Sequence, residues 1–335
     1  MGKIDNCQVG VYLSLCALKY AYLTNFKLYL PKEWTDDKEH CLKAGVPENE
    51  IVFKTKQELG LAMIKEHIEN GVHFDYVNGD GLYGNGYTFS KGVEPLGKKY
   101  VLDVHSNQQI FLQKPNIRVP EIKEGNRGRK PTLLKPDIEG ISVAEYEKTL
   151  RKSDFTELRI RPTTKGWLTA LIHVVKVWVW DEKGGDLEAI EQTLVIRKPI
   201  HKKDRMKFSL SNIKYNEQST EKFAFMQAQR FWIERCFRDD SHDLGMSDYQ
   251  VRTYKGFNNH LALTYAAMEY VQNQRLQNIT GIPLLSFNDV RILLAKEIRE
   301  NADYDIEQDR FEQVSKRHKQ RAKDIRRYYQ PDLPK

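Results

Sequence analysis

Apolar residues in the first third of the chain follow patterns that predict strands and one helix. Four segments are rich in β-branched and apolar side chains and are predicted strands: residues 7–18, 21–30, 73–79 and 99–104. A helix is predicted from Thr55, whose hydroxyl can cap it while Glu58 reaches back, and Gly71 is expected to end it. Residues 79–86 form a glycine-rich turn. The expected order is β-β-α-β-(α)-β, opening with a hairpin.

The amino-acid composition changes in the middle of the chain. Residues 114–135 are basic and rich in proline, which favours an extended segment. After Gly140 the pattern becomes mostly β, with an alternating segment over residues 173–180 and a further β segment at 194–197. We therefore expect a basic linker and an inserted β-rich module over residues 114–212.

The last third is predicted to be helical. One amphipathic helix is expected to begin near Ser219 or Thr220 and to continue through Phe237, with Arg230 and Glu234 away from its apolar face. Further helices are predicted over residues 258–275 and, as a charged tail, over 287–329. The chain is thus expected to divide into a first core part, the insertion, a second core part and a basic tail: residues 1–113, 114–212, 213–280 and 281–335.

Charge narrows the class of partner. Lysine and arginine number 53 against 46 aspartate and glutamate residues, a net charge of +7. The basic residues gather in three clusters: residues 114–135, 197–207 and 316–327. A single cluster is as well explained by a solvated surface, but three in one chain favour a nucleic acid as partner.

Apolar stretches and cysteines bear on the compartment. The longest apolar stretch, residues 167–180, contains His173 and Lys176 and is shorter than the roughly 20 residues of a spanning helix. The four cysteines form no CxxC pair, and the N-terminus does not read as a signal peptide. We expect a reduced, cytoplasmic protein with no membrane segment and no cysteine–histidine metal site.

Two acidic residues are candidates for chemistry. Asp80 ends a predicted core strand inside a glycine turn, where backbone is held and ligands can approach closely. Taken alone, such an aspartate more often caps a turn. Glu234 has Arg230 and Arg238 four residues to either side, a spacing that more often marks surface ion pairs. An acid–base hydrolase built on these two carboxylates would leave the basic clusters unexplained.

Several motifs together resemble one family. The stretches that carry the resemblance span nearly the whole chain: residues 2–9, 80–84, 128–131, 230–237, 245–252, 260–263 and 317–321. They are similar to DDE insertion-sequence transposases of the IS-four type, and more closely to its IS-seven-hundred-and-one branch. The resemblance implies an α/β fold, in which an RNase H-like mixed sheet flanked by helices is interrupted by a β-rich insertion and followed by a helical tail.

The same resemblance implies the chemistry. Three carboxylates of the family bind two Mg²⁺ ions, which activate a water or a 3′-hydroxyl for attack on a DNA phosphodiester. Asp80 matches the second carboxylate and Glu234 the third, and Arg230 keeps the family's Arg-x3-Glu spacing. The family's full signature on this helix is Tyr-x2-Arg-x3-Glu-x6-Lys. Its tyrosine and lysine positions are occupied by Gln227 and Ser241 here, so two of the four signature residues differ from the family.

Partners follow from the resemblance and from the basic clusters. Double-stranded DNA is expected, both the terminal inverted repeats of a transposon and a target site, cut by a homodimer associated with the bacterial nucleoid. The residues expected to contact DNA are Arg127, Arg129, Lys130, Arg230, Arg252, Arg321, Arg326 and Arg327. His260 also matches a family position, although a packed or solvent-facing histidine is the simpler interpretation.

The family's first catalytic aspartate lies on a strand that precedes the match to residues 2–9, and Asp5 does not lie on that strand. We therefore expect the central first strand of the sheet to be missing, two strand edges to be unpaired, and the chain alone to be an N-terminally truncated, inactive transposase. The alternative is a non-catalytic fragment that binds DNA or dimerises and acts as an inhibitor or a pseudogene remnant.

Overall fold

The computed structural model describes residues 8–17, 20–120, 131–163, 166–200, 205–250, 252–277, 287–300, 316 and 319–320. The chain opens with the predicted hairpin, in which β1 (Val9–Ala17) and β2 (Tyr20–Tyr29) pair antiparallel with a bulge between Leu13 and Ser14. Two short helices that the pattern did not predict follow the hairpin, α1 (Lys32–Thr35) and α2 (Lys38–Lys43). Each is too short to show a helical period.

The predicted capped helix is confirmed as α3 (Lys56–Glu69). The hydroxyl of Thr55 accepts from the backbone N–H of Glu58, whose carboxylate accepts from the backbone N–H of Thr55 in return. Gly71, at φ +72°, follows the end of the helix. Next come β3 (Tyr76–Gly79), α4 (Gly81–Gly84), α5 (Tyr87–Val93) and β4 (Lys99–Val104).

Two details of this stretch differ from the prediction. The strand begins at Tyr76 and not at residue 73, and the glycine-rich turn contains the short helix α4. The helix forms because Asp80 caps it, which the glycine count alone conceals. The order β-β-α-β-α-β is otherwise confirmed, apart from the added helices.

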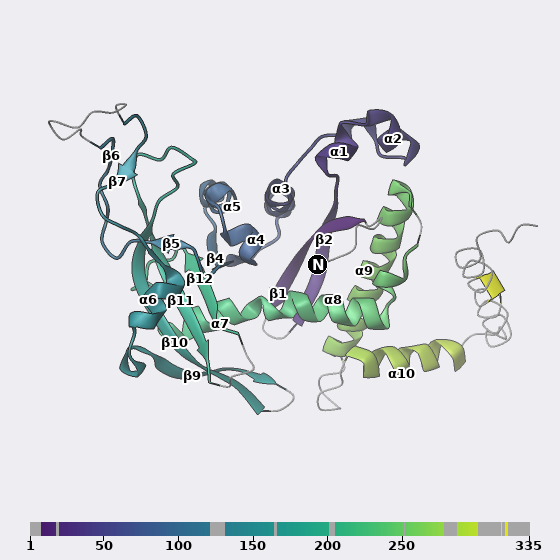
Figure 1. The fold of residues 1–335 in the computed structure, drawn as a ribbon. Coiled ribbons are helices and arrows are strands. Elements are labelled where there is room, and N and C mark those ends of the chain that lie inside the picture. The colour runs from purple at the N-terminus through teal and green to yellow at the C-terminus, as the bar shows by residue number, and fades with distance from the viewer. Residues whose placement is uncertain are drawn as a thin grey trace, which may run out of the picture.

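One curled sheet continues from the first part of the chain into the middle part. Its strand order is β3-β4-β12-β11-β10-β9, where β3 and β4 are parallel and the other neighbours antiparallel. The strands from the middle of the chain are β9 (Thr156–Thr163), β10 (Gly166–Val179), β11 (Ile190–Pro199) and β12 (Lys207–Ser211). The β-rich segment thus joins the sheet of β3 and β4 directly through β12 (Figure 1).

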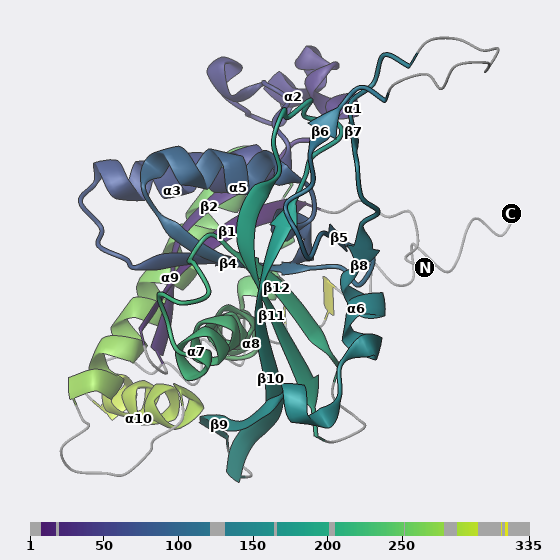
Figure 2. The ribbon, with the colours of Figure 1, turned by 90° about the vertical axis from the view of Figure 1, so that its left-hand side faces the viewer.

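Smaller elements surround these strands. Two-stranded pairings join β5 (Gln109–Ile110) with β8 (Ile141–Ser142) and β6 (Ile117–Arg118) with β7 (Lys135–Pro136). The helix α6 (Val143–Thr149) covers one face of the curled sheet, and its Val143 and Tyr146 pack with Val177 and Leu194. Helix α7 (Thr220–Gln229) covers the other face, as Figure 2 shows. Short 3₁₀ turns lie at Glu48–Glu50, Glu94–Leu96, Lys152–Asp154 and Met246–Asp248.

The helix predicted from Ser219 is capped by Ser219 as expected, but it does not run unbroken through Phe237. It is divided at Arg230 into α7 and α8 (Phe231–Asp243). The division places α7 on the curled sheet, where Phe223 is fully buried, and carries α8 across to the hairpin β1–β2 (Figure 1). A single helical period hides such a junction because Arg230 itself keeps right-handed helical dihedrals.

The remaining helices pack on the hairpin together with α8, in one shared apolar cluster. Helix α9 (Tyr254–Gln277) is longer than predicted, and α10 (Phe287–Glu300) agrees with the start of the predicted tail. Buried Ala21 and Leu23 of β2 pack with Met268 and Phe287 of these helices. Among the described residues no helix is both long and apolar enough to cross a lipid bilayer.

Candidate active site at the ends of two parallel strands

Asp80 lies directly after β3 and caps the helix that follows. Its carboxylate accepts a hydrogen bond of 2.9 Å from the backbone N–H of Leu82, which holds the side chain at the strand end. Tyr83, one turn along, is largely buried, and burial together with the nearby charge of Asp80 raises its pKa to about 12. The interpretation of Asp80 as a cap of the following turn is thus confirmed.

The turn that carries Asp80 is pressed against the neighbouring strand β4. A Cβ at Gly84 would lie 1.9 Å from the backbone oxygen of Asp103, so only glycine fits there. Asn85 accepts a 2.9 Å hydrogen bond from the backbone N–H of His105, just past the end of β4. These contacts fix Asp80 relative to the end of β4.

Asp103 is a carboxylate of this region that the sequence analysis did not single out. It is 9 % exposed, and its oxygens accept from Ser209 at 2.6 Å and pair with Arg230 at 3.1 Å and with Lys207 at 3.4 Å. Its signal in the sequence is a charge inside the apolar strand of residues 99–104, because a charge in such a place needs partners.

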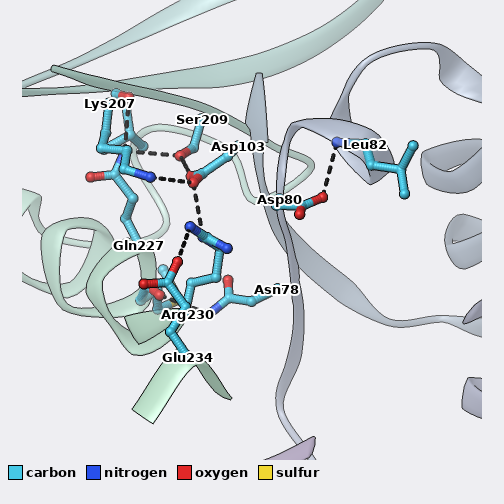
Figure 3. A network of polar contacts seen from close by, with 11 residues as sticks. Asn78, Asp80, Leu82, Asp103, Lys207, Ser209, Gln227, Arg230 and Glu234 are labelled. Atoms are coloured by element: carbon cyan, nitrogen blue, oxygen red, sulfur yellow. Dashed lines mark hydrogen bonds and ion pairs between the residues drawn. The ribbon is translucent and has the colours of Figure 1, made fainter. Parts of the chain in front are cut away.

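Arg230 links Asp103 on the sheet to Glu234 on α8. It pairs through Nε with Asp103 and through Nη2 with Glu234, one turn further along α8, at 2.5 Å (Figure 3). The side chain of Arg230 is 19 % exposed and that of Glu234 is 53 % exposed. The junction between α7 and α8 therefore presents Glu234 toward solvent while Arg230 remains anchored to the sheet.

Gln227 stands where the family signature has tyrosine, and its role here is structural. It is buried, and its amide nitrogen donates to the carbonyl of Val195 at 3.2 Å and to the hydroxyl of Ser209 at 2.8 Å. Asn78 of β3 likewise donates to the carbonyl of Met226 at 3.0 Å. Both amides fasten α7 to the sheet and so hold Arg230 and Glu234 beside β3 and β4.

A single cavity of about 890 Å³ brings the predicted residues together. Asp80, Arg230 and Glu234 all line it. None of the hydrogen bonds or ion pairs among the described residues joins Asp80 directly to Glu234; the dashed contact of Asp80 in Figure 3 is the one to Leu82. The two carboxylates thus face a shared space from two different elements.

The rest of this cavity has the form of a slot between two strands. Its walls include consecutive residues of β1 (Gly10–Ala17) and of β3 up to Asp80. In the described part of the chain β1 pairs only with β2, and β3 only with β4, so each has one unpaired edge. The slot is closed on one side by Met63 and Ile64 of α3 and on the other by side chains of α7 and α8.

Carboxylate oxygens are suitable ligands for Mg²⁺, which proteins commonly bind with one or two carboxylates, water and substrate phosphates. Asp80 and Glu234 meet that requirement in kind. The described residues contain no group of three acidic, histidine or cysteine side chains placed to hold a metal ion. Glu234 is also engaged by Arg230, so a metal at Glu234 has to compete with that ion pair.

The other predicted contact residues are not gathered at this cavity. Arg252 is exposed in the loop before α9 and does not line this cavity. Arg127, Arg129, Lys130, Arg321, Arg326 and Arg327 lie outside the described residues. His260 packs on Tyr249, and its Nε2 lies 3.2 Å from the carbonyl oxygen of Met246, which agrees with the packed interpretation.

A mixed sheet with an acidic residue after one core strand and a glutamate on a helix across the cavity is an arrangement suited to polynucleotide cleavage. The comparisons agree with that class. Residues 1–166 match the family described as DDE superfamily endonuclease, and by this match the chain belongs to that superfamily. The matched half contains Asp80 and ends before Glu234.

A more particular relative is the probable transposase for insertion sequence element IS701 of Microchaete diplosiphon. It is 30 % identical over 115 residues, which cover 33 % of this chain and 27 % of the relative. The chain therefore matches about a quarter of that relative's length. These findings confirm the family that the sequence motifs indicated.

Proposed function

We propose that this protein is a DDE-type DNA transposase subunit, built to cut and join transposon ends. The observation that supports the proposal most is the meeting of Asp80 and Glu234 at one cavity, each held there by contacts of its own. Both residues are anchored to the sheet. Asp80 directly follows β3, and Glu234 is held by Arg230, which also pairs with Asp103 of β4.

Asp80 and Glu234 would be this chain's ligands for Mg²⁺, which when bound makes a phosphodiester easier to attack by neutralising charge on its oxygens. The chain's own side chains orient the site. Asp80 is held by the N–H of Leu82, and Arg230 holds Glu234 and offers positive charge beside the cavity to a DNA phosphate. Arg230 would have to divide its donors between Asp103 and that phosphate.

The slot between β1 and β3 supports a further part of the proposal. A strand placed there would pair with both unpaired edges and join the hairpin to the curled sheet in the order β2-β1-strand-β3-β4. We propose that this is the place of the strand that bears the family's first aspartate. With the slot open, the described carboxylates number fewer than the family's set, and the chain by itself is proposed to bind DNA without cutting it.

The alternative function is a non-catalytic DNA-binding or dimerising protein that inhibits transposition. The open slot is the observation that favours it, because a chain that occupies transposon ends without cutting them would block a complete enzyme. The two functions differ in the effect of the chain on a complete transposase: an inhibitor lowers the yield of cut ends as its concentration rises.

The proposed partners are the terminal inverted repeats and the target site of double-stranded DNA, bound by a homodimer at the nucleoid. The net charge of +7 and the three basic clusters support a polyanionic partner. Contacts are proposed for the residues already predicted, with Arg230 next to the cut and the basic tail along the DNA backbone.

A salt titration tests DNA binding. Replacing Arg321, Arg326 and Arg327 together with alanine is expected to flatten the dependence of DNA affinity on salt, since each phosphate contact adds about 0.9 to the slope of log affinity against log salt. Fluorescence anisotropy of a labelled duplex, read at several salt concentrations, measures that slope. An unchanged slope would exclude backbone contact by the tail. No detectable duplex binding by the unaltered chain would argue against both proposed functions.

A further inference from the structure

A second, smaller cavity lies on the other side of the junction between α7 and α8. It has a volume of about 210 Å³, several times the share of roughly 30 Å³ that one water molecule takes in the liquid, and so has room for a phosphate group. Arg230 and Glu234 line both cavities, so the smaller one adjoins the proposed cutting site. Its floor is formed by Leu168, Thr169 and Ala170 of β10.

The walls of this cavity are strongly basic. Five cationic side chains line it against two carboxylates; the cations are Arg161, Arg197, Arg205, Lys207 and Arg230, and the carboxylates are Asp103 and Glu234. Both carboxylates are already engaged, Asp103 by Arg230 and Lys207 and Glu234 by Arg230. The lining therefore carries an excess of three positive charges, five minus two.

Adjacent strands place like charges side by side here. Arg197 of β11 lies directly opposite Lys207 of β12 in the antiparallel register, an arrangement that is unfavourable for two cations. Burial and the charge of Arg197 lower the pKa of Arg161, so these two arginines also repel one another. An anion in the cavity would be attracted by these neighbouring cations.

Arg161 is held ready to bind such an anion. Its guanidinium carbon lies 3.7 Å from the ring centroid of Phe231, the first residue of α8, and 5.6 Å from that of Trp232. Stacking on an aromatic face fixes the plane of the guanidinium, whose planar set of N–H donors matches the geometry of phosphate oxygens.

From this geometry we propose that the cavity of Arg161, Arg197 and Arg205 binds a backbone phosphate of the DNA. This phosphate neighbours the phosphate at which the strand is cut. The pocket uses the same helix junction that carries Glu234, so an occupied pocket fixes the strand relative to Glu234. The inference rests on the proposed function for the identity of the DNA, whereas binding of phosphate itself does not depend on cutting.

Inorganic phosphate is the first probe. The unfolding midpoint of the chain is expected to rise by about 2–4 °C in phosphate well above its dissociation constant, compared with sodium chloride of equal ionic strength. The double variant Arg161→Ala, Arg197→Ala should lose the rise. Arg159→Ala is the matched control, because Arg159 is an exposed arginine of the same strand β9 that does not line the cavity.

A duplex distinguishes DNA from free phosphate. The double variant is expected to reduce the salt slope of duplex binding by about 1–2. Arg159→Ala is expected to leave this slope unchanged. Loss of the phosphate effect with an unchanged salt slope would mean that the cavity holds free phosphate, and would overturn the assignment to DNA. A phosphate effect that survives in the double variant would overturn the site altogether.

Two further arms separate folding and function from the inference. Arg205 is exposed and lines the cavity, so Arg205→Ala is expected to fold normally and to weaken both effects in the same direction. If the double variant does not fold, an unaltered phosphate response in Arg205→Ala overturns the proposal. If the unaltered chain responds to phosphate but binds no duplex, the proposed function fails while the anion site stands.

Discussion

Replacing Arg230 with alanine is expected to lower the free energy of unfolding by about 2–3 kcal/mol. The substitution leaves the largely buried carboxylate of Asp103 without its 3.1 Å partner and releases Glu234 from its ion pair. The loss is smaller than for a fully orphaned charge because Ser209 and Lys207 still contact Asp103. Urea unfolding followed by circular dichroism at pH 7 measures the difference.

Arg238 provides the matched control for that variant. It lies two turns along the same helix, α8, and is exposed, so Arg238→Ala should change the free energy of unfolding by no more than about 0.5 kcal/mol. Equal stabilities of the two variants would show that Arg230 does not hold the junction of α7 and α8 to the sheet, and the account of how Glu234 is positioned would fail.

Replacing Asp240 with asparagine should stabilise the protein above neutral pH by on the order of 2–3 kcal/mol. Asp240 is completely buried in α8, and neither of its carboxylate oxygens has a hydrogen-bond partner among the described residues. Burial raises its pKa from 3.8 to about 6, against a smaller lowering effect of His260. The ionised side chain is therefore a cost to the folded state that the neutral amide avoids.

The pH dependence follows from the direction of this shift. Because the folded state binds the proton of Asp240 more tightly than the unfolded state, the contribution of Asp240 to stability falls as pH rises from about 4 to about 6 and is then constant. The gain from Asp240→Asn should be large at pH 8 and small at pH 4.5. The same change at exposed Asp248 is the control, and a gain that does not vary with pH would contradict the explanation.

The local elements of the fold could be predicted because their signals are local. The apolar, β-branched composition of β1 and β2, the alternation in β10 and the helix starts at Thr55 and Ser219 act within a few residues. The predicted bounds of the hairpin strands and of the two helix starts agree with the structure to within a few positions, whereas β10 begins at Gly166, seven residues before the predicted segment. What the pattern could not give is pairing at long range. The hydrogen bonds between β12 and β4, which merge the middle segment with the first, join residues more than a hundred positions apart.

The candidate site divides in the same way. Asp80 and Glu234 are singled out by their match to the family's motifs, and both side chains line one cavity. Asp103 was passed over because a single acidic residue in a short strand has no spacing to mark it. The division of the helix at Arg230 is also absent from the prediction, because the contact of Arg230 with Asp103 on the sheet joins residues far apart in the sequence.

A nicking assay tests the central claim most directly, that Asp80 and Glu234 form a DNA-cutting site that is incomplete while the slot between β1 and β3 is open. The substrate is labelled duplex from the DNA flanking the gene, with Mg²⁺. It is incubated with this chain alone or with the chain extended by the residues that any in-frame codons upstream of Met1 specify. We expect the chain alone to bind without nicking, and any nicking by the extended chain to vanish with Asp80→Asn. Nicking by the chain alone, or nicking that survives Asp80→Asn, would contradict the account.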